Sequence, residues 1–115
     1  MCIRDRLYAA ATGIDTSGEE LRKAGERIVN LERAFNILCG MRRKDDTLPE
    51  RFLKEPLKEG GSTGRIVNLE PMLDEYYEAR GWNKKTGIPS KEKLVELGLR
   101  RVVDDFEESR ILGWI

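Results

Sequence analysis

Apolar residues recur with a helical period through the first half of the chain. Their steps alternate between three and four residues, at Leu21, Ala24, Ile28, Leu31, Phe35 and Leu38. This spacing predicts one apolar stripe along a helix of about six turns. Ser17 and Glu20 have the spacing of a capping box, and Gly40 supplies a stop signal. We therefore expect a helix over about residues 18–39, with its apolar stripe, Phe35 included, buried as core.

The rest of the chain predicts shorter helices joined by polar turns. We expect a helix end at Leu7–Thr12, a short helix at Glu50–Lys54, a helix at Leu69–Arg80, one that follows Ser90 and points Leu94 and Leu97 inward, and one with Leu99, Val102, Val103 and Phe106 on one face. The Trp82 side chain should pack back against the predicted helix at Leu69–Arg80. Residues 58–64 are rich in glycine and predict a flexible loop. The fold class is therefore all-α, a small multi-helix assembly.

The two ends of the chain are treated apart from the fold. The codons ATG TGT ATA AGA GAC encode Met-Cys-Ile-Arg-Asp and read as a transposon adaptor used in sequencing libraries. We therefore interpret residues 1–6 as an adaptor scar and exclude them. This predicts that the natural protein continues upstream of Leu7. Residues 109–115 are a tail, for which a frayed and a docked arrangement both stay open.

Composition and charge narrow the function classes. The 115 residues suffice for one domain or a piece of one. Lysine and arginine total 21, and so do aspartate and glutamate, so no net field favours nucleic acid. No apolar run is long enough to cross a bilayer, and the first residues lack the apolar centre of a secretory signal. We expect a cytoplasmic protein that binds neither nucleic acid nor membrane.

The sequence is poor in groups that carry out chemistry. It has no histidine, so serine–histidine and cysteine–histidine pairs are excluded. Its two cysteines, Cys2 and Cys39, are too few for a site of about four thiolates. Cys39 has two interpretations. A packed or half-exposed thiol is favoured over a reactive one, which would need a lowered pKa from Arg42 or Arg43.

A dense charged turn follows the long helix. Residues 42–46 read Arg-Arg-Lys-Asp-Asp. The three basic residues could hold phosphate, and the two carboxylates could bind metal or move a proton. We favour a structural interpretation, in which these residues pair with one another and cap helix ends.

Several segments together resemble one enzyme family. They are ATGID, EELRKAGERIVNLERAFN, RRKDDTLPERFLKEPL and LDEYYEARGWNKKTGIPSKEKLVELGL, in that order. This order is similar to the C-terminal end of tungsten-dependent aldehyde ferredoxin oxidoreductases. The likeness covers residues 7–99 and extends more weakly to Phe106. It implies that residues 7–108 are part of the family's C-terminal helical domain.

The resemblance also implies what the whole enzyme does. Family members oxidise aldehydes to carboxylic acids and pass the electrons to ferredoxin, using a tungsten bis-pterin and a 4Fe-4S cluster. The family's cluster cysteines lie upstream of this segment, the last in an Asp-x-x-Gly-Leu-Cys motif that is absent here, and Cys39 does not match it. We therefore assign no catalytic, cofactor-binding or metal-binding residue to this chain.

The resulting hypothesis is a fragment of that oxidoreductase. It is not catalytic alone, packs around the cofactor and cluster region, and has the rest of the same enzyme as its partner. In this interpretation Asp45, Asp46 and Arg51 tie helix ends together. The alternative is a free-standing helical interaction module. The two differ in surface, since a fragment should leave a large apolar patch where the missing domains pack. A nucleic-acid binder built on Arg42, Arg43 and Lys44 is disfavoured by the zero net charge.

Overall fold

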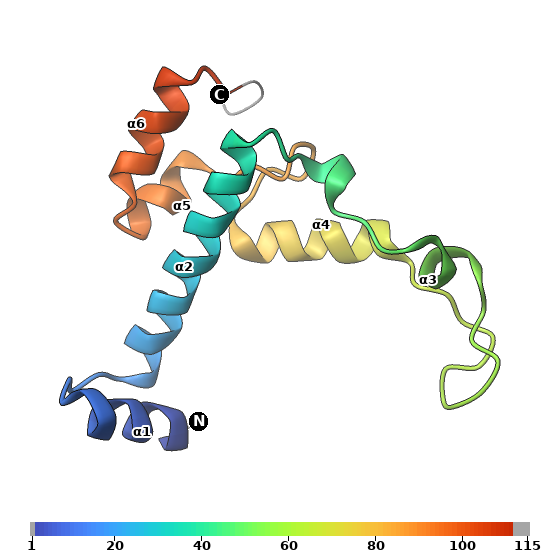
Figure 1. The fold of residues 1–115 in the computed structure, drawn as a ribbon, viewed down its shortest axis with the longest axis horizontal. Helices are drawn as coiled ribbons and strands as arrows, with labels where there is room; N and C mark the ends of the chain where they lie inside the picture. Colours follow the sequence, from blue (N-terminus) through green and yellow to red (C-terminus); the bar gives the residue numbers. More distant parts are fainter. Residues whose placement is uncertain (1, 112–115) are drawn as a thin grey trace.

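The computed structural model describes residues 2–111 and is built from α-helices (Figure 1). In chain order they are α1 (Cys2–Thr12), α2 (Gly18–Leu38), a 3-10 turn η1 (Arg43–Asp45), α3 (Glu50–Lys54), α4 (Leu69–Arg80), α5 (Lys91–Glu96) and α6 (Arg100–Glu108). Within the described residues, the strand-like pairing is one isolated antiparallel bridge between Trp82 and Pro89. The expected all-α class is confirmed.

The long helix begins and ends where its local signals predict. The backbone N–H of Ser17 donates to Glu20 Oε2 at 2.8 Å, and the Glu20 N–H donates to Ser17 Oγ at 3.2 Å, so the capping box is complete. Gly40 has a φ of 98° and donates its N–H to the Ile37 carbonyl at 3.0 Å. Because only glycine adopts this left-handed conformation at little cost, the helix stops there.

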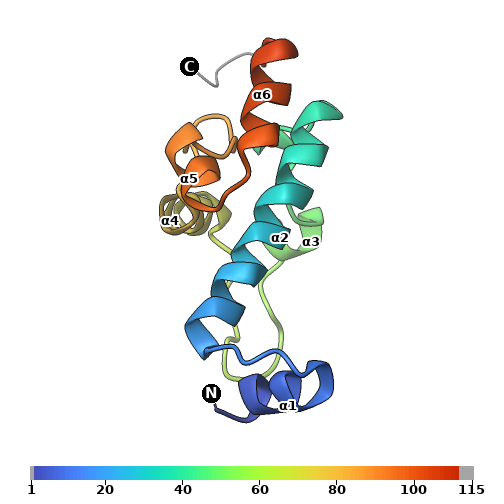
Figure 2. The same cartoon turned by 90° about the vertical axis from the view of Figure 1, so that its left-hand side faces the viewer.

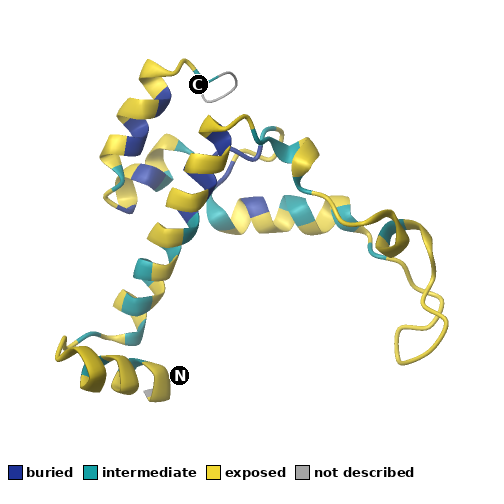
Figure 3. Cartoon of the chain, viewed as in Figure 1, coloured by how far each residue is buried: buried dark blue, intermediate teal, exposed yellow. Residues whose placement is uncertain are grey.

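The core lies where α5 and α6 pack against the C-terminal half of α2. Figures 1 and 2 show α6 alongside the upper turns of α2, with α5 beside both. The central cluster of buried apolar side chains is formed by Ala34, Ile37, Ile88, Leu94, Val102, Val103 and Phe106. Leu97, at the end of α5, is buried as well. The inward positions predicted for α5 and α6 are therefore confirmed. The N-terminal half of α2 extends away from this core towards α1 (Figure 3).

The face of α2 that forms the core was predicted wrongly. The residues of α2 that are buried are Asn30, Arg33, Ala34 and Ile37. Four members of the predicted stripe are exposed instead, with exposed fractions of 59% for Ile28, 52% for Leu31, 67% for Phe35 and 42% for Leu38. The two sets differ by one residue in register, which rotates the packed face by about 100° around the helix. We call Ile28, Leu31, Phe35 and Leu38 the apolar face of α2.

An arm of about twenty residues, 48–68, extends from the helical body. It contains α3, and its turn at residues 58–64 is exposed throughout (Figure 3). Three backbone hydrogen bonds close the arm. The Leu57 N–H donates to the Arg65 carbonyl at 3.2 Å, the Gly64 N–H to the Leu57 carbonyl at 2.8 Å and the Val67 N–H to the Phe52 carbonyl at 2.9 Å. Gly60 and Gly64 have φ values of 92° and 78°, so the glycines of this segment provide the backbone conformations of the turn.

The two ends complete the description. α1 is longer than the segment 7–12 predicted, since it already starts at Cys2. The adaptor origin of residues 1–6 and the domain bounds 7–108 stay predictions, as a short peptide of any origin can extend a helix. The predicted tail is described as far as Ile111, and residues 112–115 lie outside the described residues.

Candidate functional site

The most elaborate polar cluster surrounds Arg33 in the second half of α2. Its side chain is 6% exposed. The guanidinium donates from Nη1 to Asp46 Oδ1 at 2.8 Å, from Nη2 to Asp46 Oδ2 at 2.6 Å and from Nε to the Gly87 carbonyl at 2.9 Å. This two-pronged geometry suits the planar arginine fork. It joins α2 to the turn after η1 and to the turn that precedes α5.

Aromatic side chains from the end of α4 enclose the same guanidinium. Its central carbon lies 4.8 Å from the Trp82 ring centroid and 5.8 Å from that of Tyr77. The Tyr77 hydroxyl donates to Asp46, and the Trp82 indole N–H donates to Asn30 Oδ1 at 2.8 Å. The Trp82 ring also packs against Tyr76 and Tyr77, at centroid distances of 5.6 and 5.8 Å, as predicted. We call Asn30, Arg33, Asp46, Tyr77, Trp82 and Gly87 the Arg33 clamp.

Electrostatics keep the clamp ionised. Burial alone would raise the pKa of Asp46, but the hydrogen bonds from Arg33 and Tyr77 outweigh it and hold the pKa below its usual value. Burial and the bond to Asp46 raise the pKa of Tyr77 to about 12. Burial also opposes the charge of Arg33, yet Asp46 keeps the pKa of the guanidinium above its ordinary value. The clamp is therefore a closed, internally compensated ion pair.

Residues of the charged turn at 42–46 cap helix ends and form ion pairs with a neighbouring helix, and the capping is what the structural interpretation predicted. Arg43 donates to Asp74 Oδ1 and Glu70 Oε2, both at 2.6 Å, and so attaches the turn to α4. Asp45 accepts the Arg42 N–H at 2.8 Å and caps η1. The predicted capping is therefore found, whereas the predicted ion pairs within the turn are wrong, because Arg43 and Asp46 pair with other elements.

Two more arginines complete the account of this region. Arg42 donates from Nη1 to the Ile37 carbonyl at 2.9 Å, which satisfies the C-terminal end of α2. Arg51 was predicted to tie helix ends together, but the structure places its guanidinium over the ring of its neighbour Phe52, 5.6 Å from the centroid. Arg42 and Arg43 are therefore engaged with carbonyls and carboxylates rather than set out as a phosphate site.

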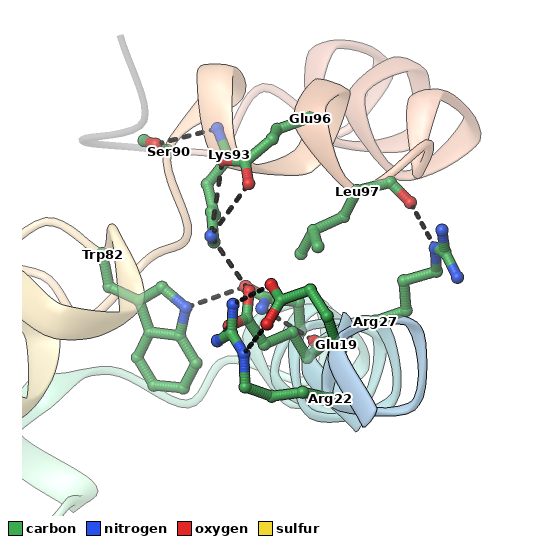
Figure 4. Close-up of polar contacts among 10 residues, drawn as sticks. Glu19, Arg22, Arg27, Trp82, Ser90, Lys93, Glu96 and Leu97 are labelled. Carbon is green, nitrogen blue, oxygen red and sulfur yellow. Dashed lines mark hydrogen bonds and ion pairs between the residues drawn. The ribbon is translucent and has the colours of Figure 1, made fainter. Parts of the chain in front are cut away.

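A second set of polar contacts joins α2 to α5 (Figure 4). Arg27 donates from Nε to the Leu97 carbonyl at 2.9 Å, at the end of α5. The Lys93 ammonium lies 3.0 Å from Glu26 Oε2. Its hydrogen bond lowers the pKa of Glu26, and the same bond raises the pKa of Lys93. These contacts lie beside the clamp and fix the angle between the two helices.

The possible metal ligands of the described residues are dispersed. Among residues 2–111, no group of three or more histidine, cysteine, aspartate or glutamate side chains is placed to hold an ion. Cys39 is a free, exposed thiol at the end of α2. Over the same residues, no helix has the length and apolar character to span a membrane. A shallow groove lies on the exposed side of α2, lined by Leu31, Glu32, Phe35 and Asn36.

Sequence reasoning found Asp46 but missed its partner. The apolar stripe predicted for α2 leaves Arg33 off the stripe, and this spacing indicates an exposed side chain. The signal that could have found it lies outside the helix: an aspartate, two tyrosines and a tryptophan within the next fifty residues supply the anion and the ring faces that a buried guanidinium requires.

Fold and site together define a class. The chain is a helical assembly in which ion pairs join the helices. Among residues 2–111, no cluster of three or more potential metal ligands is found. The comparisons with known proteins then place it. A family model described as aldehyde ferredoxin oxidoreductase, domains 2 & 3, matches residues 4–99, and the chain belongs to this family. The predicted resemblance is confirmed.

Relatives share about half of their aligned residues with this chain. It is 51% identical over 94 residues to the tungsten-containing aldehyde ferredoxin oxidoreductase of Pyrococcus furiosus and 52% identical over 94 residues to that of Pyrococcus horikoshii. Each alignment covers 81% of this chain but 15% of the relative. The chain therefore spans about 15% of the length of these relatives.

A solved structure shares the arrangement of helices. It is the active site complex BamBC of benzoyl coenzyme A reductase in complex with 1,5-dienoyl-CoA. The likeness has a TM-score of 0.74 at 38% sequence identity and covers 96% of this chain and 16% of that chain. The expected fold, a helical part of a larger enzyme, is confirmed.

Proposed function

We propose that this chain is the non-catalytic helical piece of an oxidoreductase that oxidises aldehydes to carboxylic acids and passes the electrons to ferredoxin. One observation carries the proposal: the chain matches most of its own length to tungsten enzymes while spanning about 15% of theirs. In the whole protein it packs around the region that holds the tungsten bis-pterin and a 4Fe-4S cluster. Its partner is the remainder of the same cytoplasmic polypeptide.

The donor set supports a structural role. A four-iron cluster requires about four thiolates, and the chain has two cysteines and no histidine. Three half-buried carboxylates are committed to ion pairs, Asp46 with Arg33, Glu26 with Lys93 and Asp74 with Arg43. The residues present do not fit either cofactor alone, so we derive no reaction step through them. This segment supplies a rigid helical surface beside the cofactor region, and the Arg33 clamp keeps its helices in place.

A chimaera tests the proposal. The 94-residue segment of the Pyrococcus furiosus relative that aligns with this chain is replaced by the aligned residues of this chain. A control chimaera takes the corresponding segment from the Pyrococcus horikoshii relative and verifies the boundaries. We expect the test chimaera to load tungsten and iron and to reduce ferredoxin with an aldehyde at a rate within about tenfold of the control, or about 1.4 kcal/mol. A folded test chimaera without metals or activity, beside an active control, would contradict the proposal.

The same chimaera tests whether the exposed thiol takes part. Cys39→Ser should leave iron content and aldehyde oxidation unchanged, because Cys39 lies exposed at the end of α2. A loss of iron with an intact fold would identify Cys39 as a cluster ligand. The alternative function, a free-standing interaction module, predicts that the segment fails to replace its counterpart at all.

A further inference from the structure

The apolar face of α2 is a continuous surface on the described part of the chain. Its four residues follow one another at helical spacing, and ten residues of helix span about 15 Å. Phe35 is the most exposed of them, at 67%. Exposed large apolar side chains scattered singly are ordinary, but a run along one helix marks an interaction site.

This face is not a core that failed to close. Another face of α2 already packs against the core, since Ala34 and Ile37 are buried there. The hydrogen bonds of Arg33 to Asp46 and Gly87 fix the rotation of the helix. Among the described residues, no buried side-chain nitrogen or oxygen lacks a hydrogen-bond partner. Turning the helix to bury Phe35 would expose the core and break the ion pair, so the face needs a partner from outside.

The shape and charge of the face indicate the chemistry of that partner. The groove along it is lined by two apolar side chains, Leu31 and Phe35, and by two polar ones, Glu32 and Asn36. Within residues 2–111 no ion pair is formed by Glu32, which is exposed. A suitable partner inserts an apolar side chain and brings a cationic side chain to the rim, where the Glu32 carboxylate can accept its hydrogen bond and balance its charge.

A second copy of the chain does not meet this requirement. A symmetric dimer would place the same patch on both sides. The face and its groove carry one charge, the Glu32 carboxylate, so two copies would oppose two carboxylates with no cation from the patch between them. The relatives offer another source, because the part of their length that this chain does not match is more than five times as long as the part it does.

We propose that the apolar face of α2 is the contact surface for the remainder of the full-length polypeptide, which covers it with an apolar segment flanked by a basic side chain. This inference rests on the proposed function. It goes beyond that function by specifying that the rest of the enzyme contacts the apolar face of α2, and not the face that carries Arg33.

The test uses Phe35→Glu in the chimaera, with Val95→Glu as the matched control. Val95 is an exposed apolar residue on α5, at 46%, and lies outside the apolar face of α2. Covering the face would bury the new carboxylate next to Glu32, whereas the control charge stays in solvent. We expect Phe35→Glu to lower the yield of tungsten-loaded and iron-loaded chimaera more than about tenfold, since an unpaired buried charge is costly. Val95→Glu should leave it unchanged. In the 115-residue chain alone, neither substitution should change the urea midpoint.

The outcomes separate the inference from the proposed function. An active parental chimaera that tolerates Phe35→Glu as well as Val95→Glu would overturn the contact surface and leave the proposed function standing. An inactive parental chimaera beside an active control would overturn the proposed function itself. A dimer of the isolated chain that Phe35→Glu dissociates, together with an unaffected chimaera, would assign the face to a second copy and also overturn the inference.

Discussion

Arg33 shows how a single charged side chain can organise a small helical assembly. Its guanidinium donates to the Asp46 carboxylate and to the Gly87 carbonyl, and it lies near two aromatic rings. The neighbouring Asp46 was predictable as a structural acid from its position in a charged turn. The partner was not, because hydrophobic periodicity classes every arginine as outward, and only contacts between residues far apart in sequence reverse that assignment.

Replacing Asp46 tests the clamp directly. Asp46→Asn removes the counter-charge of a buried guanidinium, which typically costs about 3–5 kcal/mol. We expect the chain to lose most of its stability to urea at pH 7, measured by circular dichroism. Asp104→Asn, at an exposed position of α6, is the control and should have little effect. Equal midpoints for the two variants would contradict a stabilising clamp.

The same variant changes the dependence on pH. The pKa of Asp46 is lower in the folded chain than its usual value of about 3.9 in the unfolded chain. Its contribution to the free energy of unfolding is therefore fully present above the unfolded pKa and is lost as pH falls through the folded one. Urea titrations from neutral to strongly acidic pH should show this loss in the parent and not in Asp46→Asn.

Gly87 is required by the same cluster for two separate reasons. It has a φ of 71°, and a Cβ there would lie 2.3 Å from Arg33 Nη2. Gly98 has a φ of 75° and nothing within 4 Å of the same position. Gly98→Ala should therefore cost only the backbone strain, about 1–2 kcal/mol. We expect Gly87→Ala to cost clearly more in urea unfolding, and equal losses would show that Arg33 moves aside freely.

At the scale of elements, the helix limits were the most predictable property. Ser17, Gly40 and Ser90 act on their own helix ends through hydrogen bonds over a few residues, so sequence alone reveals them. The buried face of α2 was not predictable in the same way. A pattern shows which residues are apolar, and in an isolated domain the most apolar face is the core. Here another face packs internally, and the apolar face is left outside.

Two phenylalanines separate the faces experimentally. Phe106 is fully buried between α6 and α2, whereas Phe35 lies on the apolar face of α2. We expect Phe106→Ala to destabilise the isolated chain by about 3–5 kcal/mol, because it leaves a cavity. Phe35→Ala should cost under about 1 kcal/mol in the same urea titration. A large loss at Phe35 would show that the predicted stripe is the core after all.

At the scale of the whole molecule, the chain is open. Its radius of gyration is 18.0 Å and its thinnest dimension 20 Å. A compact domain of this length would have a radius of about 13 Å. The arm, α1 and the lower part of α2 reach away from the core (Figure 1). The sequence predicted dependence on a larger protein through the family likeness, but the open shape itself follows from which contacts are missing and could not be read from periodicity.

An apolar dye provides a measure of that openness. The isolated chain should enhance the fluorescence of anilinonaphthalene sulfonate while keeping the near-ultraviolet circular dichroism of the packed Trp82. A molten state would bind the dye but lose that signal. Phe35→Glu should reduce the binding, and Val95→Glu should reduce it less. Absence of dye binding by a folded parent would contradict an exposed apolar face.

The Arg33 clamp has a consequence for how this family can change. Arg33 and Asp46 come from separate elements and depend on Gly87 for room. A lysine at position 33 would supply a single point charge and could not donate the two parallel hydrogen bonds that the arginine makes to Asp46. No single substitution therefore leads to an equally stable arrangement. Divergence at these three positions therefore requires simultaneous change. Members of the family should keep the trio intact or replace it entirely, with few surviving intermediates.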